Sequence, residues 1–226
     1  MKEGPDLSRI AALVGDPARA NMLSALMGGT ALTASELALE AGVTLPTASS
    51  HLAKLSDGGL VRVASQGRHR YFALAGPEVA SMLEAISGVA AAHGPKRTRP
   101  GPRDAAMREA RVCYDHLAGE KGVALFEHLM RRGHIRLDGE AATLTPSGRL
   151  WFEALGVDVD ALGGSRRPLC RACLDWSVRR SHLAGSLGAA TLALIVQRGW
   201  ARRETGSRVV AFTPPGRRAF GKLLES

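Results

Sequence analysis

Residues Thr33–Leu60, TASELALEAGVTLPTASSHLAKLSDGGL, carry the clearest structural pattern in the sequence. It reads as two short helices joined by a tight turn. Thr33 can cap the first helix, and Glu36 three residues later completes a capping box. Gly42 ends that helix where a positive φ is easiest to adopt, and Thr44 caps the second helix. This arrangement predicts a helix-turn-helix.

The second helix of this stretch has one apolar face and one polar face. Ala48, Leu52 and Leu55 recur at helical spacing and are expected to pack against the first helix. Short hydrogen-bonding side chains and one cation remain outside, which suits a helix that lies in the major groove of DNA. The alternative is an ordinary solvated face. The polar set, the cap included, is Thr44, Thr47, Ser49, Ser50, His51 and Lys54.

The segment after Gly58-Gly59, LVRVASQGRHRYFAL, alternates in polarity around a turn at Gln66-Gly67. It predicts a β-hairpin, with Tyr71 and Ala73 on the same face as Val61. The expected tip carries three basic or titratable side chains, Arg68, His69 and Arg70. A basic hairpin directly after a recognition helix is typical of a wing that touches phosphates or the minor groove.

Individual roles follow from the side-chain chemistry of this polar set. The cations of Lys54 and Arg68 are expected to contact phosphates. The shorter groups of Thr47, Ser50 and His51 are expected to read base edges.

Three features stand in an order that resembles the ArsR/SmtB family of winged-helix transcription regulators. They are DPAR at Asp16–Arg19, SSHL at Ser49–Leu52, and the wing GRHRYFAL. The resemblance covers roughly residues 1–93. It implies a cytoplasmic homodimer that binds a pseudo-palindromic double-stranded DNA operator and usually represses.

A helix is expected from about Glu78 to Ala92, behind Gly76-Pro77. It carries an apolar stripe too wide for one small domain to cover: Val79, Met82, Leu83 and Ile86, with Val89 beyond them. The resemblance implies that this helix and the first helix of the chain form the dimer interface.

The usual metal sites of the resembled family are not expected in this chain. One would need a cysteine pair near Leu37–Leu39, where there is no cysteine. The other would need several Asp and His residues between Glu78 and Ala92, where Glu78 and Glu84 are the acidic residues and His93 follows the end.

Length and composition favour two globular domains in a chain of 226 residues, 45% of them hydrophobic. The net charge of +9 fits a polyanionic partner, but residues 96–226 hold 23 Lys/Arg against 13 Asp/Glu, while residues 1–95 are near neutral. No signal peptide or membrane-spanning run is recognised, and three cysteines are too few for a secreted disulfide framework. We therefore expect a cytoplasmic protein without a membrane partner.

The part of the chain beyond residue 93 contains an internal duplication. His116-Leu-Ala-Gly recurs as His182-Leu-Ala-Gly, and Thr145-Pro recurs as Thr213-Pro. The second match is two residues further apart, an insertion that falls in an expected hairpin. We expect a winged helix-turn-helix at 1–93, a linker at 94–103, and repeats at 104–162 and 169–226. The expected fold class is mainly α with small β-hairpins (α+β), each repeat running helix, helix, hairpin, helix.

The candidate sensing residues lie in these repeats: Cys113, His116, Cys170, Cys173 and His182. Cys113-x-x-His116 with Cys170-x-x-Cys173 is a plausible tetrahedral zinc set. The same thiols could form a reversible switch responding to a thiol-reactive species. Buried packing residues are the third interpretation.

The aromatic side chains of the repeats offer a different inducer site, for an organic ligand, or simply a core. They are Trp151, Phe152, Trp176, Trp200 and Phe220.

The leading hypothesis for function is a non-enzymatic, DNA-binding transcription regulator with a C-terminal sensing domain. No nucleotide-binding glycine loop, HExxH or GxSxG motif occurs in the chain. The rivals are a thiol-redox or zinc-binding protein, and an adaptor whose winged helix binds protein.

Overall fold

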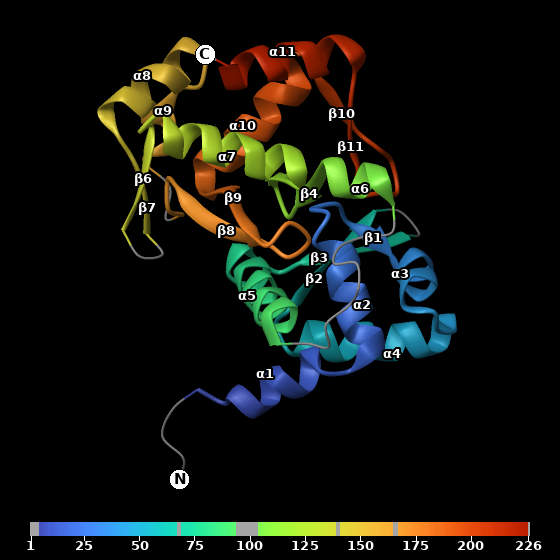
Figure 1. The fold of residues 1–226 in the computed structure, drawn as a ribbon. Coiled ribbons are helices and arrows are strands. Elements are labelled where there is room, and N and C mark those ends of the chain that lie inside the picture. The colour runs from blue at the N-terminus through green and yellow to red at the C-terminus, as the bar shows by residue number, and fades with distance from the viewer. Residues whose placement is uncertain (1–4, 67–68, 94–103, 139–140, 165–166, 226) are drawn as a thin grey trace. The chain divides into compact units, whose positions relative to one another are not determined.

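The structure is a computed structural model that describes residues 5–66, 69–93, 104–138, 141–164 and 167–225. The chain divides into two units, Met1–Leu83 and Glu84–Ser226 (Figure 1). The division falls inside helix α5 (Pro77–His93) and not after residue 93, where the sequence placed it. The expected linker, residues 94–103, lies outside the described residues.

The first unit is a winged helix-turn-helix, as expected. Its three strands form an antiparallel sheet in the order β1-β3-β2. Its elements before α5 are α1 (Leu7–Val14), α2 (Pro17–Leu26), β1 (Leu32–Thr33), α3 (Ala34–Ala41), α4 (Leu45–Asp57), β2 (Val61–Gln66) and β3 (His69–Leu74).

The helix boundaries follow the capping residues read from the sequence. The Thr33 side chain accepts from the backbone N–H of Glu36, and the Glu36 carboxylate accepts from the backbone N–H of Thr33, so the capping box is confirmed. Gly42 ends α3 with φ of 66°, in the left-handed region. The Thr44 side chain caps α4. These bonds set the turn that places α4 relative to α3.

The core of the first unit is formed by the apolar faces of α2, α3 and α4, together with the wing strands. Strand β3 of the wing turns the opposite face to the core from the one expected. Phe72 and Leu74 are buried, whereas Tyr71 and Ala73, which were expected on the same face as Val61, are half-buried. The reason is the register, which pairs Val61 with Leu74 and Val63 with Phe72. Alternation then turns Tyr71 and Ala73 to the other face. The buried helix residues are Met22, Leu23, Leu26, Leu37, Ala38, Ala48, Leu52 and Leu55.

The second unit contains the same order of elements twice: hairpin, helix, hairpin, helix. The first set is β4 (Arg111–Cys113), β5 (His116–Ala118), α7 (Glu120–Arg131), β6 (Ile135–Asp138), β7 (Ala141–Leu144) and α8 (Pro146–Ala154), preceded by α6 (Ala105–Glu109) and followed by α9 (Val159–Leu162). The second set is β8 (Arg171–Asp175), β9 (Arg180–Ala184), α10 (Gly185–Gln197), β10 (Ala201–Arg203), β11 (Val210–Phe212) and α11 (Pro214–Glu225).

The expected order of helix, helix, hairpin, helix was wrong, because a β-hairpin that the sequence did not predict directly precedes α7 in the first copy and α10 in the second, with the short helix α6 ahead of it in the first copy. In Arg111–Asp115 and Arg171–Asp175 an arginine and an aspartate enclose three largely apolar residues, a run too short to show either a helical or a strand period. Tyr114 and Arg179 have φ of 60°, and each lies between the two strands of its hairpin, where a helix cannot continue. The Cys-x-x-His spacing therefore spans a tight turn and not one turn of a helix.

The two halves of the second unit share one core. Helix α7 packs against β9 of the other half, and α10 packs against β5. Gly122 on α7 and Gly188 on α10 lie at these contacts: a Cβ there would lie 3.4 Å from the Cβ of His182 and 3.2 Å from the Cβ of His116, each in the other half. Within its own half, the same Cβ would lie 2.3 Å from the Leu117 carbonyl oxygen or 2.5 Å from the Leu183 carbonyl oxygen, so both positions need glycine. Phe152 and Phe220 are fully buried, with Trp151 and Trp200 packed against the same core. Most of these aromatic residues thus fill a core.

No helix among the described residues is both long and apolar enough to cross a membrane.

Candidate functional site

The outer face of α4 is the candidate DNA-reading surface of the first unit. Thr44, Thr47, Ser49, Ser50 and Lys54 are all exposed. The hydroxyls of Thr44 and Thr47 lie 2.9 Å apart at the start of the helix. The apolar face of α4 is buried beneath them, so the amphipathic reading of this helix is confirmed.

His51 is placed differently from the expectation. Its side chain is only 16% exposed, and its Nδ1 lies 3.2 Å from Nη1 of Arg19 and 3.9 Å from the carboxylate of Asp16. Arg19 also donates to the carbonyls of Leu13 and Ala12, both at 2.7 Å. His51 therefore joins α4 to the start of α2 and is not directed outward with Ser50, because the α2 network supplies polar partners on that side.

The wing carries one described basic side chain of the three expected at its tip. Arg70 is exposed and its guanidinium lies 5.6 Å from the centre of the Phe72 ring. His69 begins β3 opposite Gln66. Arg68 lies outside the described residues.

The expected dimerisation stripe on α5 is partly used inside the chain. Val79 is 7% exposed and belongs to the buried residues, which corrects its assignment to an interface. Met82 and Leu83 are half-buried. Ile86 and Val89 are 43% and 62% exposed. The later turns of α5 therefore present apolar side chains that a second copy could cover.

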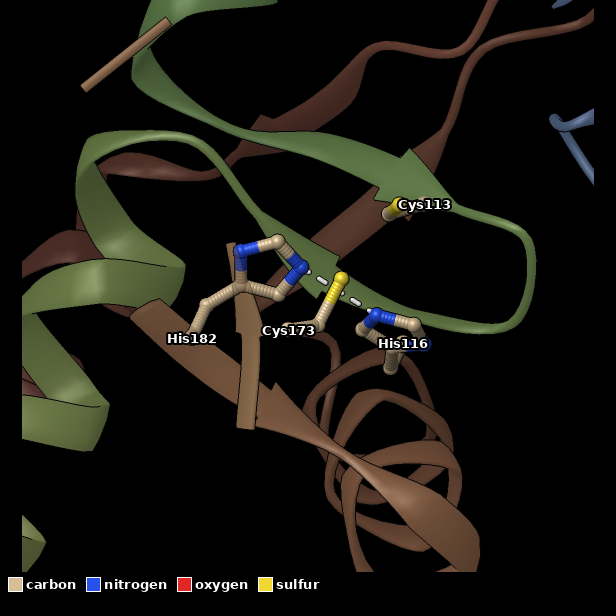
Figure 2. A group of neighbouring side chains, drawn as sticks. All are labelled: Cys113, His116, Cys173 and His182. Carbon is tan, nitrogen blue, oxygen red and sulfur yellow. Dashed lines mark hydrogen bonds between the residues drawn. The ribbon is translucent and has the colours of Figure 1, made fainter. Parts of the chain in front are cut away.

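A second candidate site, in the second unit, is formed by Cys113, His116, Cys173 and His182 (Figure 2). All four are buried, and their four candidate ligand atoms lie within 4.8 Å of one another. Each pair is opposed across a hairpin, Cys113 with His116 on β4 and β5, and Cys173 with His182 on β8 and β9. The two hairpins thus each contribute one thiol and one imidazole.

The imidazoles meet through their Nε2 atoms, 3.1 Å apart, and turn their Nδ1 atoms toward carboxylates. His116 Nδ1 lies 3.1 Å from Asp115, which is itself paired with Arg167. His182 Nδ1 lies 3.6 Å from Asp175 and is buried without a hydrogen-bond partner among the described residues. The same outward carboxylate thus occurs in both halves.

Asp175 is the most enclosed of these carboxylates. It accepts from Nη2 of Arg111 at 2.8 and 2.9 Å, and from the backbone N–H of Gly119 at 2.7 Å. The Arg111 guanidinium also lies 5.0 Å from the centre of the Trp176 ring. Burial opposes ionisation of Asp175, but Arg111 and these hydrogen bonds prevail and lower its pKa to about 2. Asp175 is therefore an anion at neutral pH.

The protons of the four-residue cluster are distributed unevenly. The hydrogen bond between the two sulfurs lowers the pKa of Cys113 and raises that of Cys173, so a negative charge is favoured on Cys113. Burial opposes the charge on His116, but hydrogen bonds to Asp115 and Cys113 raise its pKa to about 9. Burial lowers the pKa of His182. Within the cluster, negative charge is therefore favoured on Cys113 and positive charge on His116.

Glu84 on α5 is a fifth polar residue at this cluster. Its Oε1 lies 3.3 Å from the Cys113 sulfur and 3.7 Å from His116 Nε2, and its side chain is 8% exposed. Burial and then the Cys113 sulfur raise the pKa of Glu84 to about 7. The sequence indicated Glu84 only as an acidic residue at the family's usual site, because nothing in it connects residue 84 with the cysteines.

Cys170 is not brought to this cluster, which corrects the expected Cys113/His116/Cys170/Cys173 set. It is buried in the hydrophobic core, and burial raises its pKa to about 11. His182 takes the place assigned to Cys170. The internal duplication could have predicted this replacement of Cys170 by His182, because it aligns His182 with His116.

Comparisons with known proteins also identify a helix-turn-helix in the first unit. Residues 14–64 match a family described as a helix-turn-helix domain. The chain is 36% identical over 220 residues to YdfF of Bacillus subtilis, an uncharacterized HTH-type transcriptional regulator, covering 97% of each chain.

Two solved structures overlap only part of the chain. The homodimeric winged helix-turn-helix domain of Mb0332 from Mycobacterium bovis, a possible ArsR-family regulator, is 25% identical over 44% of this chain and 98% of its own, with a TM-score of 0.37. The cadmium sensor CmtR of Mycobacterium tuberculosis is 30% identical over 43% and 99%, with a TM-score of 0.33. Because the match to YdfF spans nearly all of both chains, this protein belongs to that family of HTH-type transcriptional regulators, with a winged helix-turn-helix DNA-binding domain.

Proposed function

We propose that the protein is a sequence-specific regulator of the ArsR type, acting as a homodimer, whose second unit senses an effector. The observation that carries the DNA-binding part is the exposed row of Thr47, Ser50 and Lys54 on a helix whose other face is buried, followed directly by a wing. Short polar groups suit base edges and a cation suits a phosphate.

The homodimer is supported by the exposed apolar side chains of Ile86 and Val89 on α5. A helix that presents such residues in one chain can bury them against its twin across a two-fold axis. Two recognition helices would then read the two halves of a pseudo-palindromic operator.

The sensing role is supported by the position of Glu84. This carboxylate lies on α5, the helix proposed for the dimer, and contacts Cys113 of the buried cluster. A change at the cluster would therefore act on a residue of that helix and could shift the balance between DNA-binding and DNA-free dimers. The usual outcome in the resembled family is repression that an inducer relieves.

The test is a binding titration of the full chain with duplex DNA from its own promoter and with random duplex DNA, at several salt concentrations. Lys54→Ala should weaken binding to both and reduce the slope of log K against log salt by about 0.9 per lost contact, or about 1.8 for a dimer. Ser50→Ala should change which operator sequences are preferred. Lys222→Ala, which removes an exposed cation on α11, is the matched control and should leave the slope unchanged.

Two results would contradict the proposal. Equal loss on promoter and random DNA for Ser50→Ala would remove Ser50 from base readout. A wild-type chain that binds no duplex, whatever the salt, would instead favour a winged helix that binds protein.

A further inference from the structure

We propose that Cys113, His116, Cys173 and His182 bind one thiophilic metal ion of the zinc(II) class through two sulfur and two imidazole nitrogen atoms. As a metal site the inference stands by itself, and it rests on the proposed function only in making this ion the effector of the second unit.

The distances fit a single tetrahedral ion. Metal–nitrogen bonds of about 2.0–2.1 Å place two nitrogens about 3.3 Å apart in a tetrahedron, and metal–sulfur bonds of about 2.3 Å place two sulfurs about 3.8 Å apart. The two Nε2 atoms are 3.1 Å apart, and all four ligand atoms lie within 4.8 Å of one another. Small side-chain adjustments would complete the coordination.

The orientation of the imidazoles is the second argument. A metal-binding histidine directs one nitrogen at the ion and its other N–H at a carboxylate. The Nε2 atoms of His116 and His182 face each other (Figure 2). Their Nδ1 atoms face the carboxylates of Asp115 and Asp175. Without an ion, one ring carries a proton on Nε2 and donates it to the other Nε2 across 3.1 Å. An ion bound between the rings would replace that proton and accept both Nε2 lone pairs.

The choice of ligand atoms sets the class of ion. Two cysteine sulfurs and two imidazoles form a closed set of the Cys₂His₂ type, which zinc(II) and similar ions prefer over magnesium or calcium. Two thiolates would neutralise a divalent ion, so a buried site carries little net charge. The four residues come from both halves, hence the ion would bind the two hairpins together.

A disulfide switch between Cys113 and Cys173 is the competing chemistry. It would account for the two neighbouring sulfurs but not for two buried imidazoles that converge on the same point, each with a carboxylate behind it. Cys170, the other cysteine of Cys-x-x-Cys, lies in the hydrophobic core and outside the cluster, so it is not placed to act as a resolving thiol.

The experiment begins with the full chain, reduced and stripped with a chelator. It is titrated with cobalt(II), followed by the visible absorption of tetrahedral cobalt and the near-ultraviolet band of thiolate-to-cobalt charge transfer. Zinc(II) is then added to displace the cobalt, and bound zinc is counted by mass spectrometry after dialysis. We expect one ion per chain, the spectrum of a tetrahedral site with thiolate ligands, and displacement by zinc.

The matched variants are Cys173→Ala and Cys170→Ala, two buried cysteines of one Cys-x-x-Cys run, of which only Cys173 lies in the cluster. Cys173→Ala and His182→Gln should weaken zinc binding by about 100-fold or more, beyond the usual effect of losing an outer partner. Cys170→Ala should retain wild-type affinity. Circular dichroism of each variant shows whether it has folded, and the cobalt spectrum of the wild type decides the proposal even where a variant has not.

Three results would overturn the inference: a wild-type chain that keeps no ion, an octahedral cobalt spectrum without a thiolate band, or a Cys113–Cys173 disulfide in the reduced preparation. Operator binding, measured separately with zinc and with chelator, distinguishes this failure from failure of the proposed function. Zinc binding without any operator binding would leave the metal site standing and refute the regulator. Operator binding that does not depend on zinc would make the ion structural.

Discussion

The carboxylates behind the two histidines give the sharpest prediction, because they have the same place in the two halves but different surroundings. The perturbation is the isosteric change of each to an amide, Asp115→Asn and Asp175→Asn. An amide keeps the shape and one carbonyl acceptor but removes the negative charge that strengthens a charge-assisted hydrogen bond.

For Asp115→Asn we expect a loss of metal affinity with little loss of folding stability. Outer-shell partners contribute about 10–100-fold to metal affinity. We expect an effect near the lower end of this range for Asp115, because its side chain is 31% exposed and already forms an ion pair with Arg167. Zinc affinity should therefore fall about tenfold, or about 1.4 kcal/mol. The free energy of unfolding with chelator present should change by less than about 1 kcal/mol, as for other partly exposed ion pairs.

For Asp175→Asn we expect the larger effect on folding. Both Asp175 and Arg111 are at most 1% exposed, and the amide would leave the Arg111 guanidinium buried without an opposite charge. Breaking a buried pair in this way costs about 3–5 kcal/mol. The loss should persist with chelator present, since it does not depend on the ion.

The assays are a competition titration against a chromophoric zinc chelator and urea unfolding followed by tryptophan fluorescence. All three tryptophans, Trp151, Trp176 and Trp200, belong to the second unit, so the fluorescence reports on that unit. Asp115 has no role behind a metal-binding histidine if Asp115→Asn leaves zinc affinity unchanged, or if this variant loses as much folding stability as Asp175→Asn.

Three further changes test other parts of the molecule. Ile86→Glu should dissociate the dimer in sedimentation velocity and abolish operator binding, since an unpaired carboxylate in an apolar interface costs several kcal/mol, whereas Leu150→Glu, on an exposed leucine of α8, should not. Gly188→Ala places a Cβ 2.5 Å from the Leu183 carbonyl and should lower the free energy of unfolding by about 1–3 kcal/mol, while Gly221→Ala, with nothing within 4 Å, should be neutral or stabilising. Thr33→Ala removes the capping box and should cost about 1 kcal/mol in thermal unfolding followed by circular dichroism.

The first unit could be predicted closely because its signals are local. A capping box needs only Thr33 and Glu36, and the end of α3 needs only Gly42, so each boundary is decided within one or two turns. His51 could not be placed in this way. Its partner Arg19 lies 32 residues earlier, and nothing in the periodicity of α4 shows that an edge position meets another helix.

The second unit shows where local reasoning stops. Cys-x-x-His has nearly the same separation along a helical turn as across a two-residue hairpin, so spacing alone does not choose between them. The run Arg111–Asp115 is too short to show a helical or a strand period, so local pattern does not choose either. Once both copies are hairpins, Cys113 must oppose His116 and Cys173 must oppose His182 across the strands. The pairing that sequence spacing suggested, Cys170 with Cys173, is then excluded, because Cys170 precedes β8 and has no place opposite His182. What spacing could not supply is the meeting of the two hairpins, since this depends on α7 packing on β9 and α10 on β5. Each hairpin supplies one cysteine and one histidine, and the four residues meet only because the helix of each half packs on a strand of the other half.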